Sequence, residues 1–211
     1  MRNLKIVILD WDGVFVLSHY FYYKLVEIVF RAFSKKCPSL RSYRNEVGFL
    51  GVRGFYEKHG IKNFAKVRKM EKEDREGRLS EIKINHEVRF LVAVCRALGM
   101  KTIILSNNYK GVIRSVLERS HISVDEVHSS KDKARSIEEI LKRHGVKPNH
   151  VIFVSDGTKD ILDGKKTGVQ TIGYSGGYVT YAKIRKVCPD FGGDKKITSL
   201  QDVGMIILER R

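Results

Sequence analysis

Cysteine is scarce in this 211-residue sequence, which has only three. Cys37, Cys95 and Cys188 are odd in number, lie far apart and show no C-x-x-C spacing. This usage argues against a disulfide framework or a zinc site and is typical of a reducing compartment. We expect the three thiols to be reduced and structural.

Long hydrophobic runs are also missing, and no run approaches the length that a membrane-spanning helix needs. An aromatic-rich run, HYFYYKLVEIVFRAF, is interrupted by Lys24, Glu27 and Arg31, which predicts an amphipathic helix. The first apolar run stops at Asp10, so it is a poor secretory signal. We therefore expect a cytoplasmic protein without a membrane partner.

Acidic residues are the minority, because 24 Asp and Glu stand against 40 Lys and Arg, for a net charge of +16. A basic surface attracts anions such as phosphorylated metabolites and nucleic acids. The charges are spread along the chain, and neither zinc-finger spacing nor an aromatic RNA-binding signature is present. Nucleic acid is therefore a possible partner but not the favoured one.

The apolar residues, 42% of the chain, gather into short continuous runs that are typical of strands buried on both faces. Helical patterns lie between them, and Gly145 suits a helix end. Alternation of strands and helices predicts an α/β fold, a Rossmann-like parallel sheet with helices on both faces. The expected strands are 4–9, 101–105, 151–154 and 169–174.

Residues 17–90 interrupt this alternation, because they contain several helical patterns and almost no strand-like run. The glycines of GFLGVRGF punctuate them. We predict an inserted all-helical cap domain over 17–90 and a core domain over 1–16 and 91–211. The insert holds 17 Lys and Arg against nine Asp and Glu, so half of the net charge lies there.

Polar side chains follow the apolar runs directly. In an open parallel sheet, ligands bind beyond the carboxyl ends of the strands. Carboxylates, a hydroxyl, amides and an ammonium therefore gather at one edge, where they suit a hard cation and a phosphoryl group. The residues are Asp10 and Asp12 after the first run, Ser106, Asn107 and Asn108 after the second, Ser155, Asp156 and Asp160 after the third, and Lys131 and Lys133 before the helix that leads into the third.

Each of these patterns has a simpler explanation when taken alone. D-x-D-G suits a tight turn, and Asp156 or Ser106 suits a helix cap. A calcium loop is excluded because the position of its closing glutamate holds Phe21. The order of the pieces, each beside a buried strand or at a helix start, favours a functional site.

With these motifs, the chain resembles the haloacid dehalogenase-like hydrolase superfamily. The motifs are DWDGV, ILSNN, the lysine of SSKDKAR and VSDGTKDI, and the resemblance covers essentially the whole sequence. The helical insert is similar to the cap of the phosphoglycolate-phosphatase-like branch. Two departures are Val14, where many relatives have Thr, and Ser155, where Gly is common.

The resemblance implies a role for each motif. Asp10 would be the nucleophile that forms an aspartyl-phosphate, and Asp12 the general acid and base. Mg²⁺ would be bound by Asp10, the backbone carbonyl of Asp12 and Asp156, with Asp160 ligating or orienting.

Ser106 and a lysine would hold the phosphoryl oxygens. The lysine is either Lys131 or Lys133, and its spacing from Asp156 favours Lys133. We also expect Asn107 and, in the insert, Arg53 to contact the substrate.

An acid at Asp12 favours phosphate chemistry over cleavage of carbon–halogen bonds, since a leaving halide needs no proton. The expected function is a Mg²⁺-dependent phosphatase that acts on a small phosphorylated metabolite, as a monomer or homodimer. Two alternatives stay open: a phosphomutase of the same family, and an enzyme or binder of nucleic-acid ends.

Overall fold

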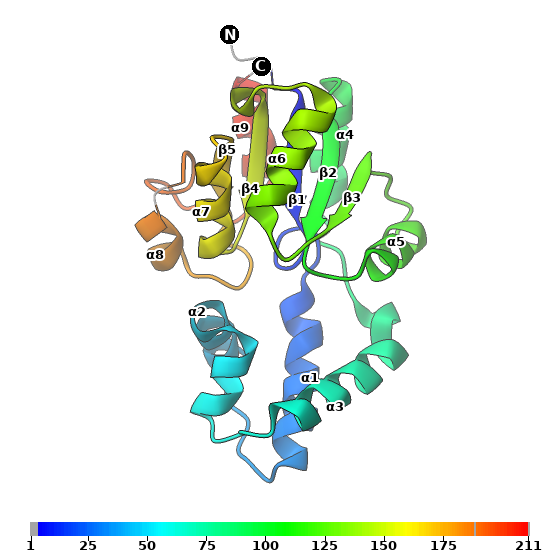
Figure 1. Ribbon diagram of the computed structural model, residues 1–211, viewed down its shortest axis with the longest axis vertical. Helices are drawn as coiled ribbons and strands as arrows, with labels where there is room; N and C mark the ends of the chain where they lie inside the picture. Colours follow the sequence, from blue (N-terminus) through cyan, green and yellow to red (C-terminus); the bar gives the residue numbers. More distant parts are fainter. Residues whose placement is uncertain (1–3, 188, 211) are drawn as a thin grey trace.

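Five parallel strands form the centre of the computed structural model, which describes residues 4–187 and 189–210. Their spatial order is β3-β2-β1-β4-β5, so β1 lies in the middle (Figure 1). The predicted α/β fold with a parallel sheet is confirmed. The strands are β1 (Ile6–Asp10), β2 (Lys101–Ser106), β3 (Glu126–Ser129), β4 (Val151–Ser155) and β5 (Gln170–Gly173).

Side chains of the sheet alternate between two buried clusters. Val7 and Leu9 of β1 face one cluster, while Ile6 and Ile8 face the other. Helices α4 (Val88–Ala97), α5 (Lys110–Arg119) and α9 (Leu200–Glu209) cover the first face. Helices α6 (Lys133–His144) and α7 (Thr158–Lys166) cover the second (Figure 1).

The expected strands and helices of the core are present, with one addition. Helix α6 ends at His144, where Gly145 adopts a left-handed conformation with φ 58° as its sequence indicates. Strand β3 was not predicted, because it is short, polar and partly exposed at the edge of the sheet. Short helical segments complete the core: η2 (Pro148–His150), α8 (Tyr181–Ile184) and η3 (Arg185–Val187).

The segment between β1 and α4 is helical and lies beyond the carboxyl ends of the strands (Figure 1). It contains α1 (Ser18–Ala32), α2 (Leu40–Lys58), α3 (Phe64–Arg78) and η1 (Leu79–Glu81). These helices bury a cluster of their own around Phe30, Phe55 and Tyr56. The glycines expected to punctuate this part lie inside α2, and only Gly51, at φ 69°, breaks the helical geometry.

The chain leaves and re-enters the core at adjacent positions. The Leu17 amide donates to the Lys83 carbonyl, the Asn85 amide donates to the Phe15 carbonyl, and Val16 forms an antiparallel bridge with Ile84. The buried Asn85 side chain also donates to the Val14 carbonyl. Helix α4 begins soon afterwards, at Val88, and packs against β2 and α9.

The cysteines that the structure describes are free thiols. Cys95 is buried, Cys37 is partly buried, and neither forms a disulfide; Cys188 lies outside the described residues. Among residues 4–187 and 189–210, no helix is both long and apolar enough to cross a bilayer.

Candidate active site

Asp10 is the last residue of the central strand and lies at the bottom of the site. Its backbone is fixed by the register of β1 with β2, in which Asp10 lies opposite Leu105. Its Oδ1 accepts a hydrogen bond from the Trp11 amide at 2.8 Å. The chain then turns through Gly13 at φ 79°, and Phe15 donates back to the Trp11 carbonyl. This tight loop brings Asp12 to the same edge as Asp10.

Lys133 is the first residue of α6, and its ammonium lies against Asp10. Its Nζ donates to Asp10 Oδ1 at 2.7 Å and to Asp160 Oδ2 at 2.6 Å. Burial acts to lower the pKa of Lys133, but the two carboxylates outweigh it and raise that pKa above its ordinary value. The lysine is therefore a fixed positive charge between two aspartates. Lys131 is exposed and lines a different, larger cavity.

Asp156 follows β4, and two glycines allow its close approach to the Asp10 loop. A Cβ at Gly13 or at Gly177 would collide with the Asp156 carboxylate. The carboxylate also accepts a hydrogen bond from the Tyr178 amide. The loop after β5 and the loop after β1 are thus both held against Asp156.

Burial and mutual repulsion change the acidity of the carboxylates. Burial raises the pKa of Asp10 well above its ordinary value. The Lys133 ammonium acts to lower this pKa, whereas the Asp160 and Asp156 carboxylates raise it further. Burial likewise raises the pKa of Asp156 to about 7. For Asp160, burial acts in the same direction, but Lys133 and hydrogen bonds outweigh it and lower the pKa. Carboxylates packed in this way are stabilised by a cation.

The carboxylates of the site determine which metal ion it could hold. In the described part of the chain, no three His, Cys, Asp or Glu side chains form a ready metal centre, and Lys133 separates Asp10 from Asp160. Mg²⁺ does not require such a centre, because it keeps several waters and binds through one or two carboxylates and substrate phosphates. Asp10 and Asp156, with the carbonyl of Asp12, fit a cation of this kind.

Asp12 and Ser106 are connected through an asparagine that was expected at this edge of the sheet but had no predicted role. Asn108 donates from Nδ2 to Asp12 Oδ2 at 2.6 Å, and its backbone amide donates to Ser106 Oγ at 3.0 Å. Ser106 is buried at the end of β2, whereas Asn107 is exposed. The side chain that orients Asp12 is therefore that of Asn108.

Ser155 is a second contributor that was expected at this edge of the sheet but had no predicted role. Its Oγ lies 3.0 Å from Asp10 Oδ2 and 3.2 Å from Asp160 Oδ2, and it accepts the Gly157 amide at 3.0 Å. Because one hydroxyl proton serves two carboxylate oxygens, Ser155 connects Asp10 to the first turn of α7. The fully buried position at the end of β4 makes this contact possible.

These groups open into a small polar cavity of about 320 Å³. Asp10, Asp12, Asn107, Lys133, Asp156 and Asp160 all line it. Arg53 is not brought to this cavity: its side chain is 71% exposed and binds Glu57 at 2.8 Å, one helical turn along α2. The helical geometry of α2 after Gly51 explains the difference, because it places Arg53 and Glu57 at i and i+4.

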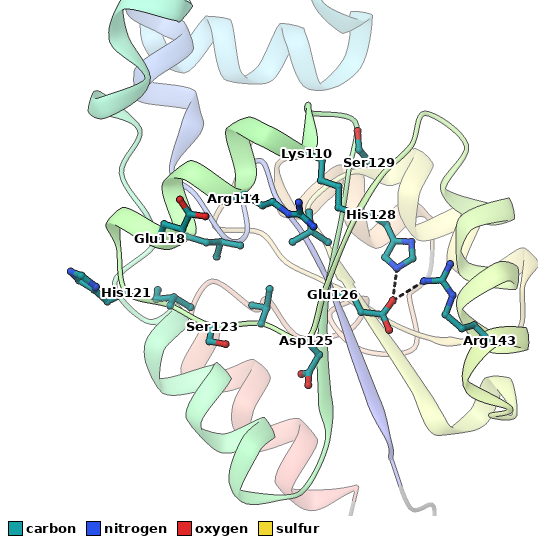
Figure 2. Close-up of a pocket in the computed structure, with 14 residues that line it drawn as sticks. Lys110, Arg114, Glu118, His121, Ser123, Asp125, Glu126, His128, Ser129 and Arg143 are labelled. Atoms are coloured by element: carbon teal, nitrogen blue, oxygen red, sulfur yellow. Dashed lines mark hydrogen bonds and ion pairs between the residues drawn. The ribbon is translucent and has the colours of Figure 1, made fainter.

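A separate hollow of about 910 Å³ lies over the edge strand β3 (Figure 2). Three carboxylates and three Lys or Arg side chains line it, so its charges are balanced. Glu126 is paired there with His128 at 2.7 Å and with Arg143 at 3.2 Å. None of the expected site residues lines this hollow.

A scan against family models connects this geometry to known proteins. The model for haloacid dehalogenase-like hydrolases matches residues 4–168, more than three quarters of the chain. The chain belongs to the haloacid dehalogenase-like hydrolases. The family predicted from the four motifs is confirmed, and with it the prediction that the chain is a hydrolytic enzyme. A comparison with curated proteins gives no match.

Solved structures share the fold of this haloacid dehalogenase-like chain over nearly its whole length. A family hydrolase from Streptococcus pneumoniae has 18% identity and TM-score 0.83, covering 98% of this chain and 100% of its own. A predicted phosphoglycolate phosphatase from Haemophilus somnus has 14% identity and TM-score 0.79, covering 98% and 99%. A family hydrolase from Deinococcus radiodurans, with bound phosphate and sodium, has 14% identity and TM-score 0.80, covering 100% and 97%.

Proposed function

We propose that this chain is a metal-dependent phosphomonoester hydrolase that works through a covalent aspartyl-phosphate. The observation that carries the proposal is the cluster at the carboxyl end of the sheet, where Lys133 holds Asp10 and Asp160. Asp12 lines the same cavity. Two proteins that share the fold, a predicted phosphoglycolate phosphatase and a hydrolase with bound phosphate, support this choice.

In the first step, a carboxylate oxygen of Asp10 attacks phosphorus, and the bond from phosphorus to the leaving oxygen breaks. Asp12 gives its proton to that oxygen, so the product leaves as a neutral alcohol. The hydrogen bond from Asn108 keeps the Asp12 carboxyl oriented for this transfer.

In the second step, water attacks phosphorus and the acyl-phosphate bond to Asp10 breaks. Asp12 takes the proton from this water, which returns the enzyme to its starting state and releases inorganic phosphate. The buried Lys133 and Ser106 hold phosphoryl oxygens and offset the charge that develops on them.

Asp10, Asp156 and the carbonyl of Asp12 would hold Mg²⁺, while Asp160 would orient the cluster through Lys133 and Ser155. When bound, the cation neutralises phosphate charge and aligns the phosphoryl group with the nucleophile. The segment 17–90 would act as a cap that excludes water from this site.

The test is release of inorganic phosphate from a chromogenic aryl phosphate, with Mg²⁺ or with EDTA. We expect turnover with the metal and loss of turnover, by at least about 100-fold, after chelation. Metal-independent turnover, or none under either condition, would contradict the proposal.

The alternatives from the sequence give different results in the same assay. A phosphomutase must protect its aspartyl-phosphate from water, so it would release little phosphate from a simple monoester. An enzyme of nucleic-acid ends would prefer a 3′-phosphorylated oligonucleotide and lose affinity steeply with salt. A cytoplasmic location and a monomeric or homodimeric state stay predictions.

Replacement of Ser155 by alanine tests whether its hydroxyl positions Asp10. Loss of a hydrogen bond to a charged group is worth about 1.5–3 kcal/mol, so we expect Ser155→Ala to lower kcat by about 10- to 100-fold. KM should change much less, because the Ser155 hydroxyl is directed at Asp10 and Asp160 and acts by positioning them. Stopped assays on the aryl phosphate, together with thermal unfolding, measure both effects.

Ser136→Ala is the matched control, because Ser136 is a buried serine on α6. It should keep its kcat. Equal losses in the two variants would show that Ser155 acts only through packing. Threonine at position 155 retains the hydroxyl and should recover part of the rate.

A further inference from the structure

A second cavity, larger than the catalytic one, extends from Asp12 into the helical insert. Its volume is about 840 Å³, against about 320 Å³ for the small cavity. The two share four lining residues: Asp12, Val47, Asn107 and Tyr178. They therefore adjoin at the residue that would protonate the leaving oxygen.

The position of the larger cavity beside Asp12 indicates where the leaving group of the substrate lies. With phosphorus beside Asp10 and the leaving oxygen beside Asp12, the rest of the substrate lies in the larger cavity. A volume of about 840 Å³ is within the range of roughly 300–1,000 Å³ that holds drug-sized ligands. A two-carbon leaving group would leave most of it filled with water.

Aromatic rings form a large part of the walls of the larger cavity, beside polar side chains. Five tyrosines line it, from helices α1 and α2 of the insert and from loops of the core: Tyr22, Tyr43, Tyr56, Tyr109 and Tyr178. Leu25, Val26, Val47 and Val52 add aliphatic surface. Flat rings beside branched aliphatic groups favour an apolar, aromatic ligand.

Several tyrosine hydroxyls already have partners within the protein. Tyr56 donates to Glu71 at 3.1 Å, Tyr178 lies 3.2 Å from Ser18 Oγ, and Tyr22 donates to Asn108 at 3.5 Å. Of these three, Tyr22 and Tyr178 are partly exposed and present mainly ring carbon to a ligand, whereas Tyr56 is fully buried. A polyol, which needs many hydrogen bonds, is less well matched to such walls.

The charges of the larger cavity argue against a second anionic group on the substrate. Arg68 lies 3.6 Å from Glu71, and both line the cavity. Lys131 is exposed and also lines the cavity, as does the acidic Asp12. The lining thus holds two Lys or Arg residues against two carboxylates, so it carries no cluster of cations for an acid such as phosphoglycolate.

We propose that the enzyme acts on phosphomonoesters whose leaving group carries an aromatic ring, which the larger cavity holds between its tyrosines. The inference rests on the proposed phosphatase function and names its substrate class. Two sources supply such a ring: an arylalkyl phosphate, with the ring near the ester, and a nucleoside 5′-monophosphate, with the ring beyond a sugar.

The first experiment compares kcat/KM for 2-(1-naphthyl)ethyl phosphate, a nucleoside 5′-monophosphate, ethyl phosphate and phosphoglycolate. The naphthylethyl and ethyl esters have leaving oxygens of similar basicity, so a difference reports the ring. We expect at least one aromatic ester to exceed both small esters by about 30-fold or more, from apolar area buried in the cavity.

A substitution that narrows the cavity tests the location of the ring. Val52 lines the cavity and is 39% exposed, so tryptophan at this position can project into it. We expect Val52→Trp to reduce the aromatic preference about 10-fold. Leu208→Trp, on α9 and 40% exposed, is the control and should leave the preference unchanged.

A second pair of variants avoids added bulk, in case Val52→Trp folds poorly. Tyr109→Ala removes a ring that lines the cavity, whereas Tyr20→Ala removes an exposed ring of α1 that does not. Only Tyr109→Ala should reduce the aromatic preference, by several-fold.

The outcomes separate the inference from the function on which it rests. Metal-dependent hydrolysis of all esters at similar kcat/KM, or a preference for phosphoglycolate, would overturn the aromatic class and leave the phosphatase in place. Failure to hydrolyse any ester, including the chromogenic one, would overturn both. An aromatic preference that Val52→Trp and Tyr109→Ala leave intact would contradict the assigned cavity.

Discussion

Replacement of Asp10 by asparagine is expected to lower phosphate release by about 1,000-fold or more. Asparagine has nearly the same shape, but its amide cannot form the acyl-phosphate at a useful rate. The fold should persist, because the Trp11 amide can still donate to the side-chain oxygen that replaces Oδ1. Steady-state release of phosphate with saturating Mg²⁺ measures the loss, and thermal unfolding shows that the fold remains.

Asp163→Asn is the matched control for this variant. Asp163 is also a buried aspartate paired with a lysine, Lys159 at 2.6 Å, but it lies on α7 and does not line the catalytic cavity. It should retain most of the activity. Activity of Asp10→Asn within tenfold of the unaltered enzyme would show that Asp10 is not the nucleophile.

Replacement of Asp12 by asparagine should give a loss that depends on the leaving group. General acid catalysis contributes about 10²- to 10⁴-fold when the leaving alkoxide is a strong base. A nitrophenolate is stable without a proton, so its release needs little help. We expect kcat/KM to fall by about 1,000-fold for an alkyl phosphate and by less than about tenfold for nitrophenyl phosphate in the first, phosphorylating step.

A series of aryl and alkyl phosphates measures this dependence as the slope of log kcat/KM against leaving-group pKa. The slope should become steeper in Asp12→Asn than in the unaltered enzyme. Parallel slopes with a uniform loss would show that Asp12 orients the loop and does not transfer the proton. Asn108→Ala should change the slope in the same direction but less, because it removes only the hydrogen bond to Asp12.

The core of the fold was predictable because four of its strands are buried and therefore have apolar sequences. β1 and β4 are buried at every position, and their sequences are continuous apolar runs. β3 carries the polar sequence EVHS at the edge, so its pairing with β2 depends on tertiary context. The glycines of α2 were expected to interrupt the helices of the insert, and Gly51 does so with φ 69°, while Gly48 and Gly54 stay in helical geometry.

The candidate site was predictable where a side chain follows directly from a strand or begins a helix. The ends of β1, β2 and β4 position Asp10, Ser106 and Asp156, respectively. The start of α6 positions Lys133. The roles of these residues stay predictions. The start of α6 at Lys133 explains why this lysine, and not Lys131, lies against Asp10.

Contacts that depend on side-chain direction were not predictable from spacing. Asn107 and Asn108 are neighbours in sequence, but only Asn108 bonds to Asp12. Ser155 reaches Asp10 only because β1 and β4 are adjacent in the sheet. The five tyrosines of the larger cavity come from three segments, the insert and the loops after β2 and β5, which no local pattern brings together.

The chain leaves the core at Val16 and re-enters it at Ile84, and the pairing of these two residues has an evolutionary consequence. The two ends of the insert are hydrogen-bonded to each other. The insert is therefore a closed loop, and its length does not change the positions at which it joins the core. Lengthening a closed loop costs little, about 0.6 kcal/mol for each doubling. An ancestor could therefore gain, lose or exchange these helices while β1 and β2 stayed paired. Selection for a new leaving group can act on the helices while the chemistry of the Asp10 loop stays fixed.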